Sequence, residues 1–146
     1  MKTVLALITT FFCSVVFADD CATTIESADT MRFNKASIDV PAHCTSFTLT
    51  LNNTGTLAKN IMGHNWVLTK ASDAKSVVKD GASQGLANNY LSPNDPRVIA
   101  NTRITGGKES ASVTFDVSKL TKEESYLYFC SFPGHMSMLK GSLRLI

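Results

Sequence analysis

The chain has 146 residues, of which 44% are hydrophobic and 18% are charged. This size and composition are typical of one globular domain, and they exclude a disordered segment. Lys and Arg number 14 against 12 Asp and Glu, so the net charge is only +2. Because phosphate binding needs a concentrated basic surface and these cations are scattered along the chain, the composition also argues against nucleic acid as the partner.

Residues 1–18 predict a cleaved secretory signal peptide. Lys2 precedes an almost wholly apolar stretch that ends on Ala18, and the chain turns acidic at Asp19. The stretch is shorter than the roughly 20 residues that span a bilayer, and its small terminal residue suits signal peptidase. The acidic residues that begin at the expected cleavage site argue against the alternative, which is a buried N-terminal helix. We therefore expect a mature domain of residues 19–146, soluble in the periplasm and without a membrane span. It retains 13 cations (14 less Lys2) against 12 acids.

The cysteines predict one disulfide and one thiol with a separate role. Cys13 is lost with the leader, which leaves three cysteines in a compartment where cysteines usually pair. Cys21 and Cys44 are early and close in sequence, whereas Cys130 stands alone near the C-terminus. We therefore expect a bond between Cys21 and Cys44. It would close a loop of about 24 residues and stabilise the fold by about 3 kcal/mol.

The mature chain is predicted to be mostly β. In residues 46–51 the apolar side chains Phe47, Leu49 and Leu51 alternate with polar ones, the period of a half-buried strand. Similar short runs between turn residues predict further strands at 37–40, 65–69, 98–100, 111–117, 126–129 and 142–146. Several short strands at this spacing indicate a sandwich or a barrel. Residues 72–81 start at the N-cap type Ser72 and end on Gly81, which predicts a short helix in a long connection.

Three potential metal ligands lie at expected strand ends. Four residues separate Cys130 from His135 in a segment between two expected strands, and His64 lies 66 residues upstream of Cys130. A structural zinc site needs a fourth donor and a catalytic one needs a water. One thiolate and two imidazoles with Met136 and Met138 nearby form a soft donor set, which suits copper. Two His and one Cys in a plane with a weak axial group is the electron-transfer copper arrangement.

The segments around these residues resemble a known family. Residues 62–68, Met-Gly-His-Asn-Trp-Val-Leu, and 129–135, Phe-Cys-Ser-Phe-Pro-Gly-His, are similar to the ligand segments of bacterial type 1 blue-copper proteins of the cupredoxin family. The resemblance covers the whole mature chain, including both early cysteines and residues 59–62, 90–93 and 113–120. It implies an all-β, two-sheet Greek-key β-sandwich with one short inserted helix.

The resemblance also assigns roles position by position. The three implied equatorial copper ligands are His64, Cys130 and His135. The carbonyl of Gly63 is implied as a weak axial group. Asn65 matches a residue that joins the two ligand loops and donates its backbone N–H towards the thiolate, and the N–H of Phe132 matches a second such donor. Hydrogen bonds of this kind withdraw charge from the sulfur and raise the reduction potential.

One position departs from the family pattern. The family places a Met four residues after the second His ligand, just before a Lys-Gly pair. Here Leu139 precedes that pair, and the thioether stands one residue earlier, at Met138. The final strand keeps its alternation beyond this point, so a shift of register would cost core burial. We expect Leu139 to occupy the axial position without coordinating, which would raise the potential. The alternative is a local bulge that brings Met138 onto copper.

Together these features predict a one-electron carrier that cycles between Cu(I) and Cu(II), not an enzyme. We expect a monomer that docks through an apolar patch around His135, formed by Leu57, Met62, Pro133 and Met136. The resemblance implies redox proteins as partners, namely c-type cytochromes and a nitrite reductase or peroxidase. Two other classes stay open at this point: a copper carrier or buffer, which would release its metal readily, and a metal-free sandwich used for adhesion, which would leave Cys130 reactive.

Overall fold

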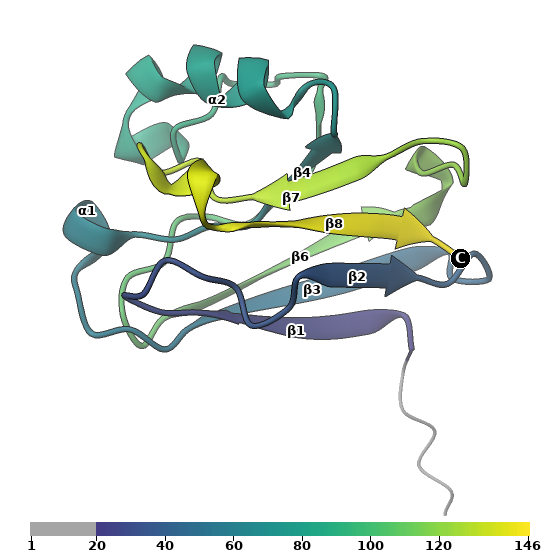
Figure 1. The fold of residues 1–146 in the computed structure, drawn as a ribbon, viewed down its shortest axis with the longest axis horizontal. Helices are drawn as coiled ribbons and strands as arrows, with labels where there is room; N and C mark the ends of the chain where they lie inside the picture. Colours follow the sequence, from purple (N-terminus) through teal and green to yellow (C-terminus); the bar gives the residue numbers. More distant parts are fainter. Residues whose placement is uncertain (1–19) are drawn as a thin grey trace, which may run out of the picture.

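The computed structural model describes residues 20–146, so the predicted signal peptide and its cleavage site lie outside the described part. Eight strands form two sheets (Figure 1). One sheet has the order β1 (Ala22–Ser27), β3 (Ser46–Asn53) and β6 (Ser110–Asp116). The other has the order β2 (Ser37–Val40), β8 (Lys140–Leu145), β7 (Tyr126–Phe129), β4 (Val67–Lys70) and β5 (Val98–Asn101). The predicted all-β sandwich is confirmed.

Each sheet combines one parallel pair with one or more antiparallel pairs. β1 runs parallel to β3 and β2 runs parallel to β8, and the other neighbours are antiparallel. The predicted alternation in β3 is confirmed, because Phe47, Leu49 and Leu51 are buried and the polar residues between them are more exposed. β1 was not predicted from the sequence. Its only large apolar residue is Ile25, and pairing with β3 rather than its own pattern makes it a strand.

The space between the sheets is filled around Trp66. Its ring stacks on Phe115, with centroids 6.2 Å apart, and on Tyr128, at 5.9 Å. The outer face of the larger sheet is covered as well. There α2 (Ala74–Gly81) closes a second cluster made of Val67, Ala74, Val77, Leu91 and Phe129. β4 and β7 are therefore packed on both faces, which restricts their movement.

The predicted helix is present but shorter than residues 72–81. It starts at Ala74 with Asp73 in the N-cap position, so Ser72 is not the cap. A Cβ on Gly81 would lie 2.2 Å from the carbonyl oxygen of Tyr90, which explains why a glycine ends it. The remaining helical turns are α1 (Lys59–Met62), η1 (Ala82–Gln84), η2 (Leu86–Asn88), η3 (Val117–Lys119) and η4 (His135–Ser137). Within residues 20–146, no helix has the length and apolar character needed to cross a bilayer.

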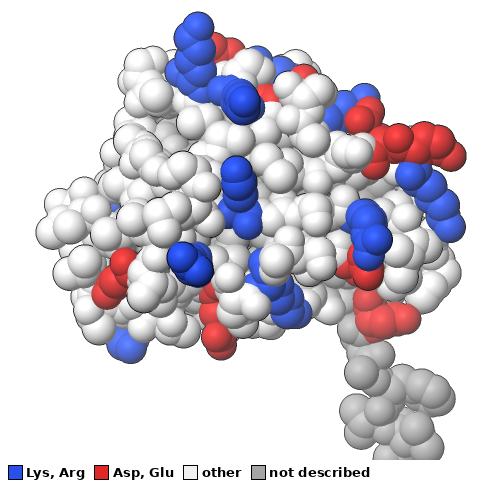
Figure 2. All heavy atoms as spheres, viewed as in Figure 1, with Lys and Arg blue, Asp and Glu red and all other residues white. Residues whose placement is uncertain are grey.

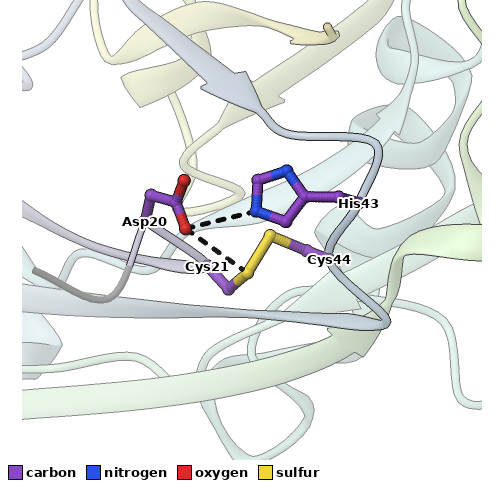
Figure 3. The surroundings of a disulfide bond; sticks show 4 residues. All are labelled: Asp20, Cys21, His43 and Cys44. Carbon is purple, nitrogen blue, oxygen red and sulfur yellow. Dashed lines mark hydrogen bonds and ion pairs between the residues drawn. A yellow bond between two sulfur atoms is a disulfide. The ribbon is translucent and has the colours of Figure 1, made fainter. Parts of the chain in front are cut away.

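The predicted disulfide between Cys21 and Cys44 is confirmed. It joins the start of β1 to the segment before β3, with the two Cα atoms 5.7 Å apart. Figure 3 shows Asp20 and His43 beside it, where Nε2 of His43 lies 3.4 Å from a carboxylate oxygen of Asp20. In Figure 1 this end of the sandwich is opposite to the end that carries α1 and the loop before β8.

Candidate metal centre

Strand pairing brings the three predicted ligands to one end of the sandwich. β4 and β7 are antiparallel with Val67 opposite Phe129, so the start of β4 lies beside the end of β7. His64 comes shortly before β4 and Cys130 directly after β7. His135 lies in η4, in the loop that returns the chain to β8. The register of two buried strands thus places segments 66 residues apart next to each other.

The three side chains form a compact, buried cluster. Their metal-binding atoms all lie within 4.8 Å of one another. Sγ of Cys130 is 3.7 Å from Nδ1 of His135 and 3.8 Å from the carbonyl oxygen of Gly63. His64 and Cys130 are fully buried, and His135 keeps 5% of its surface exposed. His135 is therefore the one member of the cluster that reaches solvent.

The fold fixes which nitrogen of His64 is free to bind a metal. Its Nε2–H donates to the carbonyl oxygen of Ala28 at 2.9 Å, so Nδ1 is the unprotonated nitrogen. That Nδ1 is buried and has no hydrogen-bond partner among the described residues. The main chain is held too, because the carbonyl of His64 accepts hydrogen bonds from the N–H and the Oγ1 of Thr105, each at 2.8 Å. A buried lone pair without a partner is costly unless a metal ion occupies the site.

Burial sets the protonation of the cluster. It raises the pKa of the Cys130 thiol to about 12, although the backbone N–H groups of Asn65 and Phe132 bond to the sulfur and act in the opposite direction. Burial, with a smaller effect of His64, lowers the pKa of His135 to about 4. Burial likewise lowers the pKa of His64. At neutral pH without a metal, the cluster therefore holds a protonated thiol and two neutral imidazoles whose lone pairs are available.

The side chain of Asn65 joins the two ligand-bearing segments. Its Oδ1 accepts from the backbone N–H of Ser131 at 2.9 Å, and its Nδ2 donates to Oγ of Ser131 at 2.8 Å. Oγ of Ser131 lies 2.6 Å from the carbonyl oxygen of Asn89 and donates to it. Asn65 and Ser131 are both buried. This network holds the segment before β4 and the loop after β7 at a constant separation.

Leu139 and Met138, the two candidates for the axial position, differ in burial. Leu139 is fully buried, its N–H donates to the carbonyl of His135 at 2.8 Å, and its carbonyl accepts from the N–H of Cys130 at 3.0 Å. Met138 is 47% exposed. A Cβ on Gly63 would lie 2.3 Å from the carbonyl oxygen of Lys59, so this position requires glycine, whose own carbonyl oxygen lies 3.8 Å from Sγ of Cys130.

The residues of the predicted apolar patch come from two loops at this end of the molecule. Leu57, which is 39% exposed, and the half-buried Met62 flank and end α1. Pro133 is exposed in the loop before η4, and Met136 packs partly against the cluster under α2. Figure 1 shows α1 and this loop at the same end of the sandwich. Among residues 20–146, Ile61 on α1 is the most exposed large apolar residue, at 61%.

Sequence reasoning missed several residues that support the cluster. These are Ala28, Asn89, Thr105 and Ser131. Ser131 could have been suspected because it follows Cys130 directly. Ala28 and Asn89 act through main-chain carbonyls, which carry no side-chain signature in a sequence.

A second group of potential ligands lies around the disulfide (Figure 3). Both of its sulfur atoms are in the bond between Cys21 and Cys44 and so offer no thiolate. The two remaining groups, Asp20 and His43, have side chains that are 65% and 67% exposed. Among the described residues, the buried group at the other end is therefore the one that combines a free thiol with imidazoles.

Comparison with known proteins identifies the metal that such a cluster holds. The family described as copper binding proteins, plastocyanin/azurin family, matches residues 19–146. The azurin of Bordetella pertussis is 50% identical over 135 residues, which are 92% of this chain and 90% of that protein. The azurin of Pseudomonas aeruginosa is 49% identical over 130 residues, 89% of this chain and 88% of that protein. A solved structure of the azurin Az-iso2 from Methylomonas sp. strain J superposes with a TM-score of 0.84 at 52% identity, covering 86% of this chain and 98% of the other.

These matches confirm the resemblance seen in the sequence, and they agree with the chemistry of the cluster. A thiolate and two imidazoles are soft donors that favour copper. The unpartnered Nδ1 of His64 beside a buried free thiol fits such an ion. Copper is the cofactor of this protein family, and the cluster of His64, Cys130 and His135 fits it.

Proposed function

The chain belongs to the plastocyanin/azurin family of copper binding proteins, and on this premise we propose that it is a periplasmic one-electron carrier with a mononuclear type 1 copper centre. His64, Cys130 and His135 would hold the copper as its equatorial ligands, and the carbonyl of Gly63, which lies 3.8 Å from Sγ of Cys130, would be a weak axial group. When bound, copper supplies the Cu(I)/Cu(II) couple. The observation that carries the proposal is the buried, unpartnered Nδ1 of His64 next to a buried free thiol.

The protein's part in this function is to hold the ligands still. An electron carrier exchanges electrons fast when its ligands move little between oxidation states. β4 and β7 are packed on both faces, the side chain of Asn65 joins their ends, and the imidazole of His64 is held by Ala28. Each constraint acts whether or not the metal is oxidised, so the ligand geometry is a compromise that suits both states.

The axial position distinguishes this chain within the family pattern. We assign it to Leu139, which is buried and bonded through its backbone to both loop ligands, and not to Met138, which lies half in solvent. A hydrocarbon side chain cannot donate to copper. Because a thioether would favour Cu(II) more than a hydrocarbon does, Leu139 favours the reduced state and raises the potential.

Electrons enter and leave through His135. It is the only ligand with exposed surface, and the exposed or half-exposed residues Leu57, Met62, Pro133 and Met136 lie at the same end. A small apolar surface suits short-lived contacts with redox proteins. The proposed partners are c-type cytochromes, with a nitrite reductase or a peroxidase downstream, and the proposed carrier acts as a monomer.

The proposed location follows from two features of the chain. The apolar leader that ends at Ala18 is typical of an exported protein. The disulfide between Cys21 and Cys44 is expected in an oxidising compartment and is rare in the cytosol. Cleavage after Ala18 would leave the domain that the family match covers, residues 19–146.

The proposal is tested by the visible spectrum of the purified mature protein after addition of Cu(II). We expect an intense blue thiolate-to-copper band that disappears in Cys130→Ala and in His64→Ala. The matched control is His43→Ala, which alters an exposed histidine at the opposite end and should leave the band unchanged. A colourless protein with a thiol that still titrates after copper is added would refute the proposal.

A further inference from the structure

Beside the copper centre lies a hollow with a basic rim that the proposed function does not explain. It has a volume of about 200 Å³ and is lined by Arg32, Phe33, Lys35, Ala36, Met138 and Lys140. We refer to it as the basic hollow. We propose that it recognises carboxylate side chains on the docking face of the redox partner. This inference rests on the proposed electron carrier and adds a charge preference to its apolar contact.

The positive charges of the basic hollow are not neutralised by the protein itself. The ion pairs among residues 20–146 use other cations, and none involves Arg32, Lys35 or Lys140. No acidic residue lines the hollow. Nζ of Lys35 donates to Oγ1 of Thr23, a neutral partner, at 2.5 Å. Figure 2 shows Lys and Arg side chains, with Asp and Glu side chains among them, across the face on which β2, β8 and the connection between β1 and β2 lie.

Both walls of the basic hollow connect directly to the copper ligands. One wall contains Met138, whose N–H donates to the carbonyl of His135 at 3.0 Å. The other is the connection between β1 and β2, which begins at Ala28, the residue whose carbonyl holds Nε2 of His64. A partner seated on the hollow would therefore lie beside the backbone that carries both imidazoles.

The connection that supplies Arg32 and Lys35 is fixed before any partner arrives. The N–H of Asn34 donates to the carbonyl of Glu26, and the Oδ1 of Asn34 accepts from the N–H of Glu26 at 2.8 Å. The hydroxyl of Tyr128 on β7 donates to the carbonyl of Lys35 at 2.6 Å. A surface that is already ordered loses little conformational entropy when a partner binds.

The chemistry favours a protein partner over a lipid surface. Sites for acidic lipids usually gather four to eight cations, whereas this hollow has three, together with the ring of Phe33 and the thioether of Met138. The mature chain as a whole is nearly neutral, with 13 cations and 12 acids. A local positive rim is therefore what can orient the chain on an acidic docking face and accelerate the encounter.

The test compares two triple variants with the same change in net charge. The first is Arg32→Gln, Lys35→Gln and Lys140→Gln. The control is Lys75→Gln, Lys79→Gln and Lys122→Gln, three exposed lysines without ion pairs, two of them on α2. Each reduced, copper-loaded protein is mixed with hexacyanoferrate(III), which accepts one electron per protein, and separately with the cation tris(phenanthroline)cobalt(III).

At 10 mM ionic strength, we expect the first variant to reduce hexacyanoferrate(III) about tenfold more slowly than the unaltered protein and the control to change less than twofold. With the cobalt cation the first variant should react faster. Both differences should shrink at 1 M salt, where charges are screened within about 3 Å. Equal rates for the two variants would show that only net charge matters and would overturn the inference.

A hexaglutamate peptide provides the binding test. Followed by NMR, it should shift amide signals of residues 32–36 and 138–140 in the unaltered protein and leave them unmoved in the first variant. Shifts that persist in the variant would overturn the inference. So would a protein that does not respond to the peptide but binds phosphatidylglycerol vesicles, if the first variant loses that binding. Failure of the electron-carrier proposal can be told apart from failure of this inference. In that case the unaltered protein would show no blue colour and would transfer no electrons to either complex.

Discussion

Burial determines how many protons copper displaces at the centre. At pH 7 the thiol of Cys130 is protonated because burial raises its pKa to about 12, and His135 is neutral because burial lowers its pKa to about 4. Binding of Cu(II) should therefore release one proton, taken from the thiol. The apparent affinity should rise about tenfold for each unit of pH in the neutral range, since the deprotonated thiol is the ligand.

Calorimetry in two buffers of different ionisation enthalpy measures this proton count. We expect a value of one for the unaltered protein and of zero for any residual binding to Cys130→Ala. A count of zero for the unaltered protein would mean that the thiol is already ionised. A count of two would mean that an imidazole is protonated at neutral pH.

A pair of single substitutions tests the axial assignment. Leu139→Met should lower the reduction potential, because a thioether at a buried position next to both loop ligands favours Cu(II). A tenfold gain in the preference for Cu(II) corresponds to a fall of about 59 mV for a one-electron couple. Met138→Leu, which alters a half-exposed side chain, should leave the potential unchanged. Redox titration of the blue band measures both, and the opposite pattern would place Met138 on copper.

At the scale of residues, the sequence indicated the side chains but not their main-chain partners. His64, Cys130 and His135 were predicted from residue type and spacing, and the structure brings them within 4.8 Å. The carbonyl of Ala28 could not be predicted, because any residue has a carbonyl and only the tertiary fold brings this one to the imidazole. The protonation of the cluster was equally out of reach, since it depends on burial.

Among the structural elements, the link between the two ligand segments depends on one amide side chain. Asn65→Ala removes the acceptor for the buried N–H of Ser131, and leaving such a group unsatisfied costs about 1–3 kcal/mol. We expect the free energy of unfolding of the copper-free protein to fall by that amount in a denaturant titration. Asn88→Ala, which removes an exposed bond to Gln84, should cost less than 0.5 kcal/mol. Equal losses would contradict the role assigned to Asn65.

The disulfide should affect stability without affecting the copper centre. The double substitution of Cys21 and Cys44 by Ala opens a loop with a sequence separation of 23 residues, which should lower the free energy of unfolding by about 3 kcal/mol. The bond lies at the end of the sandwich away from η4, so the blue band and the potential should stay the same (Figures 1 and 3). Chemical denaturation and redox titration of the same sample check both parts. A shifted potential would show that the two ends are coupled.

At this scale the sequence predicted strands where side-chain alternation was strong. β3 was predicted well because Phe47, Leu49 and Leu51 alternate cleanly with polar residues. β1 was missed because its residues are mostly polar, and its parallel pairing with β3 is a long-range effect. α1 was missed because one turn without a buried residue leaves no periodic pattern.

At the scale of the whole molecule, the disulfide that stabilises the fold and the cluster that fits copper lie at opposite ends of the sandwich. The disulfide secures one end, and α1 and the loop before β8, which carries His135, lie at the other (Figure 1). The basic hollow is lined by Met138 from that loop, by Lys140 and by residues between β1 and β2. His64 and Cys130 are fully buried, so solvent and partners reach the cluster through His135. This arrangement suits a carrier that keeps its metal, whereas a copper buffer would need an open site that releases it.

The central claim is that the protein exchanges one electron while copper stays bound. The most direct test is a reductive and oxidative titration of the blue band, with the copper content of the protein measured before and after a complete cycle. We predict a reversible one-electron transition and full retention of copper. Loss of copper on reduction, or a band that does not return on reoxidation, would contradict an electron carrier and indicate a copper-delivery protein.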